Sequence, residues 1–306
     1  MGREENVKVF QDTERLVKER KALSEAVKYS TKNQILIPEY MQVADMMPGG
    51  GERSRVDGDG GSNGKSSDGS NDKNSKGSHC GQAGEIVVSK KRTYEAAAAY
   101  KGKKVCVHNF ASATNPGGGV TKGSSAQEEC LCRCSTLYFN LNTSDMWGGF
   151  YAPHRTAKDP IHNDDCIYTP EVVVFKTDTD CPKLMPENEW YKVNVVTCAA
   201  PNLRLMPSNG MNSGDGMTRA KLSEEELYHL HVKRLSRIME VAVAGGNEVM
   251  ILGAFGCGAF ENNPEVVAKA SKAVAEKYRS CFAVIEFAIY CSPRDEQNYR
   301  IFSRVI

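Results

Sequence analysis

The sequence contains no apolar run that approaches the roughly 18 residues of a membrane-spanning helix. Its N-terminus is charged and leads into no apolar segment of signal-peptide length. It also lacks a basic excess, since 39 Lys and Arg residues stand against 38 Asp and Glu residues, whereas duplex-binding proteins usually carry a basic stripe. We therefore expect a soluble intracellular protein, cytoplasmic or, in a eukaryote, nuclear, with no membrane partner and no direct nucleic acid partner.

A disulfide or zinc pattern is also missing, although the chain has 11 cysteines. The number is odd, the chain is too long for a small disulfide scaffold, and without an export signal the thiols should stay reduced. Cys130, Cys132 and Cys134 are separated by single residues, whereas zinc ligands are usually about two to four residues apart. The sequence therefore predicts packing roles for these cysteines and no metal site.

Composition divides the chain into three parts. Apolar residues recur at three- and four-residue spacing over residues 11–30, which is typical of an amphipathic helix. From residue 48 to residue 81 the chain is mostly Gly, Ser, Asp, Asn and Lys, a composition that cannot offset the entropy cost of ordering. We predict an N-terminal helical segment at 1–48 that packs on the main domain, a flexible low-complexity insertion at 49–83 and a folded domain at 84–306.

Beyond the insertion, short apolar segments alternate with helical ones. Strands are expected at Glu85–Ser89, Lys104–Asn109, Ile167–Phe175, Val193–Cys198, Val249–Leu252 and Ala283–Tyr290. Helices are expected at Thr93–Tyr100, Ser125–Tyr138, Ser223–Ala244 and Pro264–Arg279. Several of the strands are near-continuous apolar runs, as in sheets that are covered on both faces. The alternation predicts an α/β domain with a mostly parallel or mixed sheet.

A first glycine-rich segment joins an expected strand to an expected helix. It reads Asn115-Pro116-Gly117-Gly118-Gly119 and leads, after seven residues, into Gln127-Glu128-Glu129. Consecutive glycines allow the backbone to approach a ligand closely, and a strand, a loop and a helix start form the usual ligand site of open α/β sheets. Glu128 and Ser125 fit a capping box, but the side chain of Glu129 leaves the helix in another direction, at about 100° per residue. The spacing alone leaves a functional role for Glu129 open.

A second glycine-rich segment repeats this arrangement late in the chain. Gly253, Gly256 and Gly258 lie between an apolar strand and a helix, where freed backbone N–H groups can point at an anion. No Gly-Lys-Ser/Thr follows, so the segment is not a P-loop, and no acidic partner for a dinucleotide ribose lies downstream. Phe255 and Phe260 flank the loop. Each ring could stack on a base or a ribose of a ligand, or could pack in the protein core. For Phe255 the core position is slightly favoured.

Taken together, the two segments resemble the bacterial-type poly(ADP-ribose) glycohydrolase family. The three glycines, the gap and the Gln-Glu-Glu sequence are similar to its signature, and residues 197–202 and 253–260 agree with the family in the expected order. The similarity extends over nearly the whole chain outside the insertion. The resemblance implies a macrodomain-like three-layer α/β/α fold with a mixed, mostly parallel sheet, in which residues 84–306 form a catalytic domain that binds ADP-ribose.

The resemblance also implies roles for individual residues. Glu129 would be the catalytic acid/base, Glu128 would form a hydrogen bond near the scissile linkage, and Phe260 would pack against the terminal ribose. The 253–260 loop would cradle the diphosphate, with affinity from backbone donors and helix N-termini. The residues implied to bind substrate are Asn115, Gly117, Gly118, Gly119, Gln127, Gly253, Gly256, Cys257, Gly258 and Phe260.

The implied activity is hydrolysis of the ribose–ribose glycosidic linkages of poly(ADP-ribose), with ADP-ribose polymers or ADP-ribosylated proteins as partners. Protonated Glu129 would donate its proton to the departing ribose oxygen, and the resulting carboxylate would then activate water. This route needs a raised carboxyl pKa, which partial burial could provide. It needs no metal and no redox cofactor.

Three other activities compete with this prediction. A hydrolase of mono-ADP-ribosyl-protein or of O-acetyl-ADP-ribose would share the fold. So would a non-catalytic ADP-ribose-binding module, although binding alone does not need a second acid. A cysteine hydrolase with Cys257 or Cys198 as nucleophile and His108 or His154 as base lacks a recognisable motif. Release of free ADP-ribose from polymer or from singly modified protein separates the remaining alternatives.

Overall fold

The computed structural model describes residues 2–47, 83–210, 213–292 and 295–306. The insertion predicted at 49–83 lies outside these ranges except for its last residue. No helix in the described ranges has both the length and the apolar character that crossing a membrane requires.

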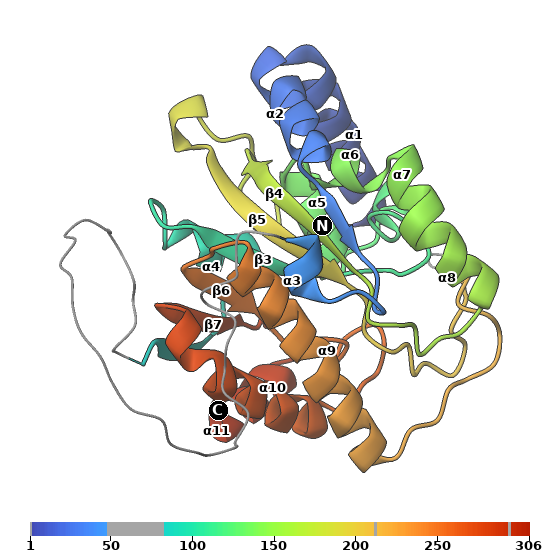
Figure 1. Cartoon of the computed structure of the whole chain (residues 1–306). Helices are drawn as coiled ribbons and strands as arrows, with labels where there is room; N and C mark the ends of the chain where they lie inside the picture. Colours follow the sequence, from blue (N-terminus) through green and yellow to red (C-terminus); the bar gives the residue numbers. More distant parts are fainter. Residues whose placement is uncertain (1, 48–82, 211–212, 293–294) are drawn as a thin grey trace.

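The centre of the described structure is a seven-stranded sheet with the order β1-β4-β5-β3-β6-β7-β2 (Figure 1). The strands are β1 (Ile35–Ile37), β2 (Glu85–Ser89), β3 (Val105–Phe110), β4 (Cys166–Val174), β5 (Tyr191–Cys198), β6 (Val249–Leu252) and β7 (Val284–Ala288). Strands β5, β3, β6, β7 and β2 run parallel to one another, and β4 is antiparallel to β1 and β5. The prediction of a mixed, mostly parallel sheet is confirmed, although β1 was not predicted.

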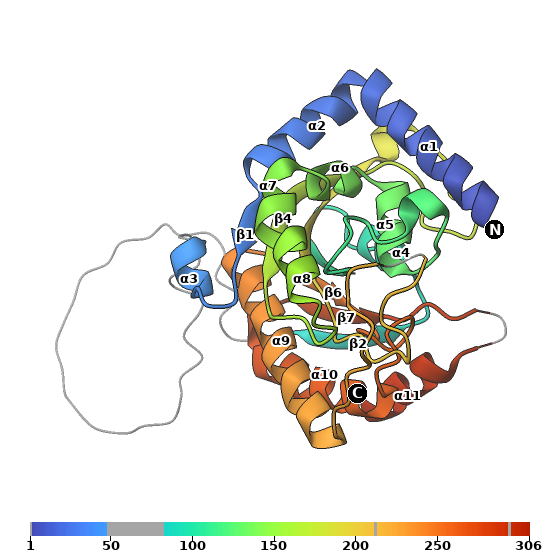
Figure 2. The ribbon, with the colours of Figure 1, turned by 90° about the vertical axis from the view of Figure 1, so that its right-hand side faces the viewer.

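Helices cover both faces of this sheet (Figure 2). The α-helices are α1 (Arg3–Glu19), α2 (Lys21–Lys32), α3 (Val43–Met46), α4 (Thr93–Ala98), α5 (Gln127–Cys134), α6 (Leu137–Leu141), α7 (Ser144–Met146), α8 (Ala152–Ala157), α9 (Glu224–Ala244), α10 (Pro264–Tyr278) and α11 (Gln297–Val305). Short 3₁₀ turns lie at η1 (Val120–Lys122), η3 (Glu187–Glu189) and η4 (Arg279–Cys281), and η2 (Trp147–Tyr151) is a π-helical turn.

Successive residues of a strand pack into different hydrophobic cores on the two faces of the sheet. On β6, Met250 and Leu252 pack with α9, α10 and α11, whereas Val249 and Ile251 pack with α1, α4, α5 and α6. Side chains alternate between faces because a strand has a period of two. The near-continuous apolar runs follow from this double burial, and the predicted three-layer α/β/α fold is confirmed.

Helices α9 and α10 begin where the sequence predicts. The hydroxyl of Ser223 accepts a hydrogen bond from the N–H of Glu226, and the Glu226 carboxylate accepts one from the N–H of Ser223, which completes the capping box. Asn263 accepts a hydrogen bond from the N–H of Glu265, and Pro264 occupies the first turn of α10. Local side-chain chemistry therefore defines both starts.

The helix predicted at Ser125–Tyr138 is interrupted in the structure. Helix α5 ends before Ser135, whose extended backbone pairs with Val174 of β4. The N–H of Thr136 donates to the carbonyl of Val173 at 3.0 Å. This short pairing satisfies backbone groups on the edge of β4, and it outweighs the helical pattern of the sequence.

The order of the strands opens a crevice at one edge of the sheet. After β3 the chain builds β4 and β5 on one side of that strand, and it later returns to build β6 and β7 on the other side. The loops that follow β3 and β6 therefore diverge, and such a point at the carboxyl ends of parallel strands is where open α/β sheets bind ligands. Both glycine-rich segments follow these two strands.

Candidate active site

A cavity of about 360 Å³ lies at this edge, beyond the carboxyl ends of β3 and β6. Of the twelve predicted site residues, eight line it: Gly118, Gly119, Gln127, Glu128, Glu129, Gly256, Gly258 and Phe260. The other four, Asn115, Gly117, Gly253 and Cys257, are not part of its wall. The structure therefore brings the two glycine segments and the two acids together around one space.

Glu128 is held by donors at both of its carboxylate oxygens. The backbone N–H of Ser112 donates to Oε2 at 2.8 Å, and the side-chain amide of Asn109 donates to Oε1 at 3.2 Å. Helix α5 is preceded by Ala126, which has no capping side chain. The capping-box interpretation of Ser125 and Glu128 is therefore wrong, because the Glu128 side chain turns toward the end of β3 instead.

Glu129 has one oxygen with a donor and one without. The N–H of Gly119 donates to Oε1 at 2.9 Å. Oε2 is buried and accepts no hydrogen bond from the described residues, although the side chain lines the cavity. Burial without a donor disfavours the charged form of a carboxyl group, and a protonated carboxyl becomes a hydrogen-bond donor. Oε2 is thus suited to carry a proton toward a ligand.

Gly118 brings the first glycine segment against both acids. Its φ is +56°, and a Cβ there would lie 2.5 Å from Oε1 of Glu129 and 3.2 Å from Oε2 of Glu128. Gly117 serves packing instead, since a Cβ there would lie 2.8 Å from the ring of Tyr138. Gly118 therefore approaches the acids so closely that a side chain there would clash with them.

Burial raises the pKa of both carboxyl groups. The pKa of Glu128 rises to about 8, because of burial first and the charge of Glu129 second, and burial also raises the pKa of Glu129. Two adjacent buried acids resist double ionisation, so the pair holds one proton at neutral pH. Ser112 and Asn109 stabilise the carboxylate form of Glu128, and the N–H of Gly119 does the same for Glu129, so these donors oppose the effect of burial at both acids.

Gln127 connects the start of α5 to β3 and α4. Its Oε1 accepts from the N–H of Phe110 at 2.9 Å. Its Nε2 donates to the carbonyl of His108 at 2.7 Å and to the hydroxyl of Thr93 at 3.1 Å. These bonds orient the first turn of α5, and with it the two acids that follow Gln127.

The second glycine segment forms the opposite wall. A Cβ at Gly256, where φ is +77°, would lie 2.7 Å from the Cβ of Ala200, whereas a Cβ at Gly258 would meet nothing within 4 Å. Gly256 therefore allows the loop to pack on the segment after β5, and Gly258 leaves the cavity open. Gly253 packs below the cavity, since a Cβ there would lie 2.8 Å from the carbonyl oxygen of Ala288.

Asn262 fastens this second loop to the segment after β5. Its Nδ2 donates to the carbonyl oxygens of Gly256 at 3.1 Å and Pro201 at 2.7 Å. Its Oδ1 lies 2.8 Å from Nε2 of His231. Burial lowers the pKa of His231 to about 4, so the ring is neutral at physiological pH and donates from Nε2. The amide orientation of Asn262, and hence the loop, is fixed by these three partners.

The two phenylalanines of this segment have different surroundings. Phe255 is fully buried, and its ring packs edge-on against those of His108 and His231. It belongs to the core, as the sequence favours. Phe260 is half-buried and lines the cavity, and the guanidinium carbon of Arg204 lies 5.4 Å from its ring centroid. An aromatic ring and a cation therefore stand together on this wall.

Several residues of the cavity wall were missed by the sequence analysis. Arg92 and Tyr290 both line the cavity, and the guanidinium carbon of Arg92 lies 3.7 Å from the Tyr290 ring centroid. Only the parallel pairing of β2 with β7 brings them together, so no local pattern marks them. Ser112 lies within the stretch between β3 and the glycines, where a backbone donor to an acid could have been sought.

The cysteine alternative finds no support in the described structure. Cys198 is fully buried at the end of β5, and burial raises the pKa of the Cys257 thiol. His108 is enclosed by the rings of Phe110 and Phe255. Over the described ranges, no group of three or more His, Cys, Asp or Glu side chains is arranged to hold a metal ion.

These features define a macrodomain-like α/β/α domain in which two glycine loops and a pair of acids enclose a ligand cavity. The chain belongs to the microbial-type PARG catalytic domain family, which matches residues 4–177, more than half of its 306 residues. The match includes the first glycine segment, both acids, α2 and all of α1 except its first residue. Among curated proteins, none matches the chain.

Solved structures of poly(ADP-ribose) glycohydrolase from two organisms share this fold. The structure from Thermomonospora curvata is 25% identical to this chain, with a TM-score of 0.74 over 98% of this chain and 99% of that one. The same protein bound to the inhibitor ADP-HPD is 24% identical, with a TM-score of 0.74 over the same shares of the two chains. The structure from Deinococcus radiodurans in complex with ADP-ribose is 25% identical, with a TM-score of 0.68 over 91% of this chain and 96% of that one.

Proposed function

We propose that the chain hydrolyses the ribose–ribose linkages of poly(ADP-ribose) and releases ADP-ribose, with Glu129 as the general acid and base. Membership of the PARG family supports the activity. The observation that supports the role of Glu129 is its Oε2 atom, which is buried on the cavity wall and has no donor among the described residues.

In the proposed reaction, Oε2 of Glu129 donates its proton to the ribose oxygen that departs. The bond from that oxygen to the anomeric carbon of the released ribose breaks, and positive charge develops on this ribose. A water molecule then attacks the anomeric carbon and gives a proton to the Glu129 carboxylate, which restores its starting state. One carboxyl group thus serves both steps.

Glu128 supports this reaction without exchanging a proton. Its carboxylate is held by Asn109 and Ser112, and two oxygens offer about four lone-pair sites, so acceptor positions remain for a ribose hydroxyl. In its carboxylate form, Glu128 also stabilises the positive charge that develops on the ribose. Its role is therefore positioning and electrostatic.

The opposite wall suits the diphosphate and the second ribose. Gly258 leaves open space beside the backbone of its loop, and backbone N–H groups of glycine loops can bind anions. Arg204 adds a positive charge, and Phe260 offers a ring face to a ribose. This wall can therefore hold a charged, sugar-containing ligand in front of the acids.

One assay tests the proposed activity directly. Purified protein is incubated with poly(ADP-ribose) and, separately, with mono-ADP-ribosylated protein, and free ADP-ribose is quantified. We expect release from the polymer. Release from the singly modified protein alone would favour a mono-ADP-ribosyl hydrolase, and tight ADP-ribose binding without any release would favour a binding module.

Phe260→Ala should weaken ADP-ribose binding more than it weakens folding. Loss of a stacking aromatic ring typically costs on the order of 1–3 kcal/mol, which corresponds to roughly 5- to 150-fold in Kd. Calorimetric titration and thermal unfolding measure the two effects. Phe139→Ala is a matched control, because Phe139 is also half-buried but packs beside α1 and α2 away from the cavity. An unchanged Kd with a lower Tm would assign Phe260 to the core.

Turnover should fall as pH rises through the pKa of the shared proton. Both carboxyl pKa values are raised, so the protonated form that the first step needs extends to higher pH than for an ordinary carboxyl group and is lost as pH rises further. Glu128→Gln removes the like charge that opposes ionisation of Glu129, and it should move this alkaline limb to lower pH. Measuring kcat from about pH 5 to about pH 9 tests both points. A limb that stays in place in Glu128→Gln would refute the shared proton.

The same raised pKa values predict the pH dependence of stability. A folded state with raised carboxyl pKa values binds more protons than the unfolded chain between the ordinary carboxyl pKa and the raised one. The free energy of unfolding should therefore decrease as pH rises through this interval.

A further inference from the structure

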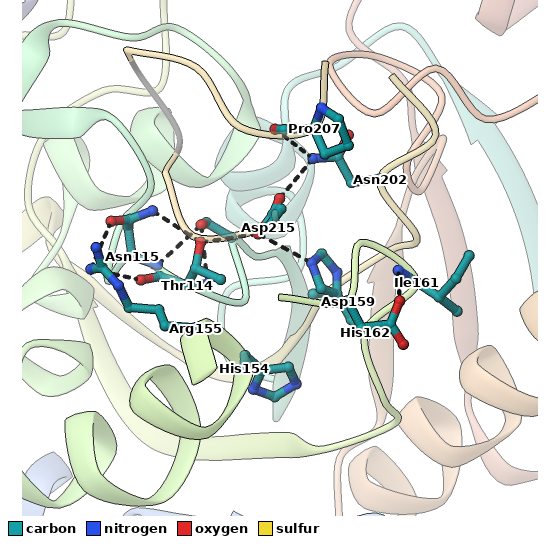
Figure 3. A network of polar contacts seen from close by, with 12 residues as sticks. Thr114, Asn115, His154, Arg155, Asp159, Ile161, His162, Asn202, Pro207 and Asp215 are labelled. Atoms are coloured by element: carbon teal, nitrogen blue, oxygen red, sulfur yellow. Dashed lines mark hydrogen bonds and ion pairs between the residues drawn. The ribbon is translucent and has the colours of Figure 1, made fainter. Parts of the chain in front are cut away.

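A buried carboxylate outside the cavity joins three parts of the chain (Figure 3). The hydroxyl of Thr114 directs its one proton between Oδ1 of Asp215 at 3.1 Å and the carbonyl oxygen of Ser213 at 2.8 Å. The amide of Asn202 donates to Oδ2 of Asp215 at 2.7 Å. Nε2 of His162 lies 3.4 Å from Oδ1. Burial alone would raise the pKa of Asp215, but His162, Asn202 and Thr114 together hold it below its ordinary value. Asp215 is therefore ionised and accepts at both oxygens.

The first arm of this network leads to the catalytic acid. Gly214 packs directly on Thr114, since a Cβ at Gly214 would lie 2.9 Å from the Thr114 Cβ. The loop that starts at Thr114 reaches Gly119, whose N–H donates to Oε1 of Glu129 at 2.9 Å. Asp215 thus restrains the beginning of the loop that orients Glu129.

The second arm leads to the opposite wall of the cavity. Oδ1 of Asn202 accepts from Nε of Arg204 at 3.0 Å, and Arg204 lies over the ring of Phe260. Nδ1 of His162 lies 2.9 Å from the carbonyl oxygen of Ala200, and its ring centroid is 6.1 Å from that of Phe260. Arg204, Ala200 and Phe260 all line the cavity.

We propose that Asp215 is a positioning residue that sets the spacing between the two walls of the active site, through Thr114 on one side and Asn202 and His162 on the other. Asp215 does not line the cavity, so its effect on the reaction is indirect. A carboxylate suits this position because the Thr114 hydroxyl and the Asn202 amide both donate to it. Asparagine would place an N–H₂ group against the donor of Thr114 or against that of Asn202. This inference rests on the proposed function for its kinetic readouts.

A network that served folding alone would change the melting temperature and leave catalysis and binding as they are. The two arms predict a different outcome, because each ends at a different part of the site. Loss of the first arm should lower kcat, since it ends at Glu129. Loss of the second arm should raise the Kd for ADP-ribose, since it ends at Arg204 and Phe260.

The first arm is tested by two substitutions at one position. Thr114→Val keeps the shape of the side chain and removes its hydroxyl, whereas Thr114→Ser keeps the hydroxyl. We expect Thr114→Val to lower kcat on poly(ADP-ribose) by about tenfold or more, since small misplacements of reacting groups are costly. The Kd of Thr114→Val for ADP-ribose should stay within about threefold of wild type. Thr114→Ser, which keeps the hydroxyl, should have a kcat within about threefold of wild type.

The second arm is tested by Asn202→Ala, which releases both Asp215 and Arg204. We expect its Kd for ADP-ribose to rise by about tenfold or more, with a smaller effect on kcat. Gly210→Ala is the matched control, because Gly210 lies in the same segment between β5 and α9 and a Cβ there meets nothing within 4 Å. This control should leave kcat and Kd unchanged.

Asp215→Asn should lower kcat and raise the Kd for ADP-ribose. The double variant Asp215→Asn/Thr114→Val should have a kcat no lower than that of the slower single variant, because both substitutions break the contact between Asp215 and Thr114. If Asp215→Asn does not fold, the variants at Thr114 and Asn202 decide. The proposal would be overturned if kcat of Thr114→Val and the Kd of Asn202→Ala were both within about twofold of wild type, whatever the melting temperatures of the two variants. Wild-type protein that releases no ADP-ribose would instead overturn the proposed function, and the Kd of Asn202→Ala would still test the role of the network.

Discussion

Glu129→Gln should lower turnover of poly(ADP-ribose) by about 10²–10⁴-fold, the contribution typical of a positioned proton donor. The substitution keeps the size of the side chain and an acceptor oxygen, so the N–H of Gly119 retains its partner. It removes the proton that Oε2 would transfer. The Kd for ADP-ribose should change little, because the protonated carboxyl group of the proposed mechanism and the glutamine amide are both neutral. Measurements of kcat and of Kd by titration separate the two effects.

Glu128→Gln provides the comparison within the same helix turn. Both oxygens of Glu128 accept hydrogen bonds, from Ser112 and Asn109, so a glutamine would face one of these donors with an N–H₂ group. Leaving buried donors unpaired typically costs about 1–3 kcal/mol. We therefore expect a lower Tm and a smaller loss of turnover, whereas Glu129→Gln should melt near wild type. Activity that survives Glu129→Gln would remove Glu129 from the chemistry.

Much of the fold could be predicted because its signals are local. The caps of α9 and α10 involve residues two or three positions apart, and burial on both faces of the sheet produces recognisable apolar runs. Strand β1 and the break at Ser135 could not be predicted in this way. Both depend on pairing with β4, as in the contact of Ile35 with Tyr168 and that of Ser135 with Val174.

The candidate site shows the same division. The acids and the glycines of the first segment lie close together in the sequence, so their pattern and the family resemblance predict them as site residues. Arg92 and Tyr290, and equally Thr114 and Asp215, meet only in the folded chain. Asp215 lies in a segment without helix or strand, where no periodicity could mark it. A position within a glycine motif also does not by itself predict contact with the cavity. Gly253 belongs to the second glycine segment but packs below the cavity.

Gly118→Ala should also lower turnover strongly, through the position of the acid rather than through its chemistry. The added Cβ would lie 2.5 Å from Oε1 of Glu129, which is closer than van der Waals contact allows. The carboxyl group must then move away from the N–H of Gly119, and Oε2 moves with it. A misplacement of about 1 Å can cost about 10²-fold, and we expect kcat/KM to fall by this order.

Gly102→Ala is the matched control for backbone strain. Gly102 has a φ of +93°, also in the region that favours glycine, but a Cβ there would meet nothing within 4 Å. Its Tm should fall while kcat/KM stays at the wild-type value. The double variant Gly118→Ala/Glu129→Gln should be little slower than Glu129→Gln alone, because the closest contact of the added Cβ is with Glu129. A further loss in the double variant would show that Gly118 contributes to the reaction by another route.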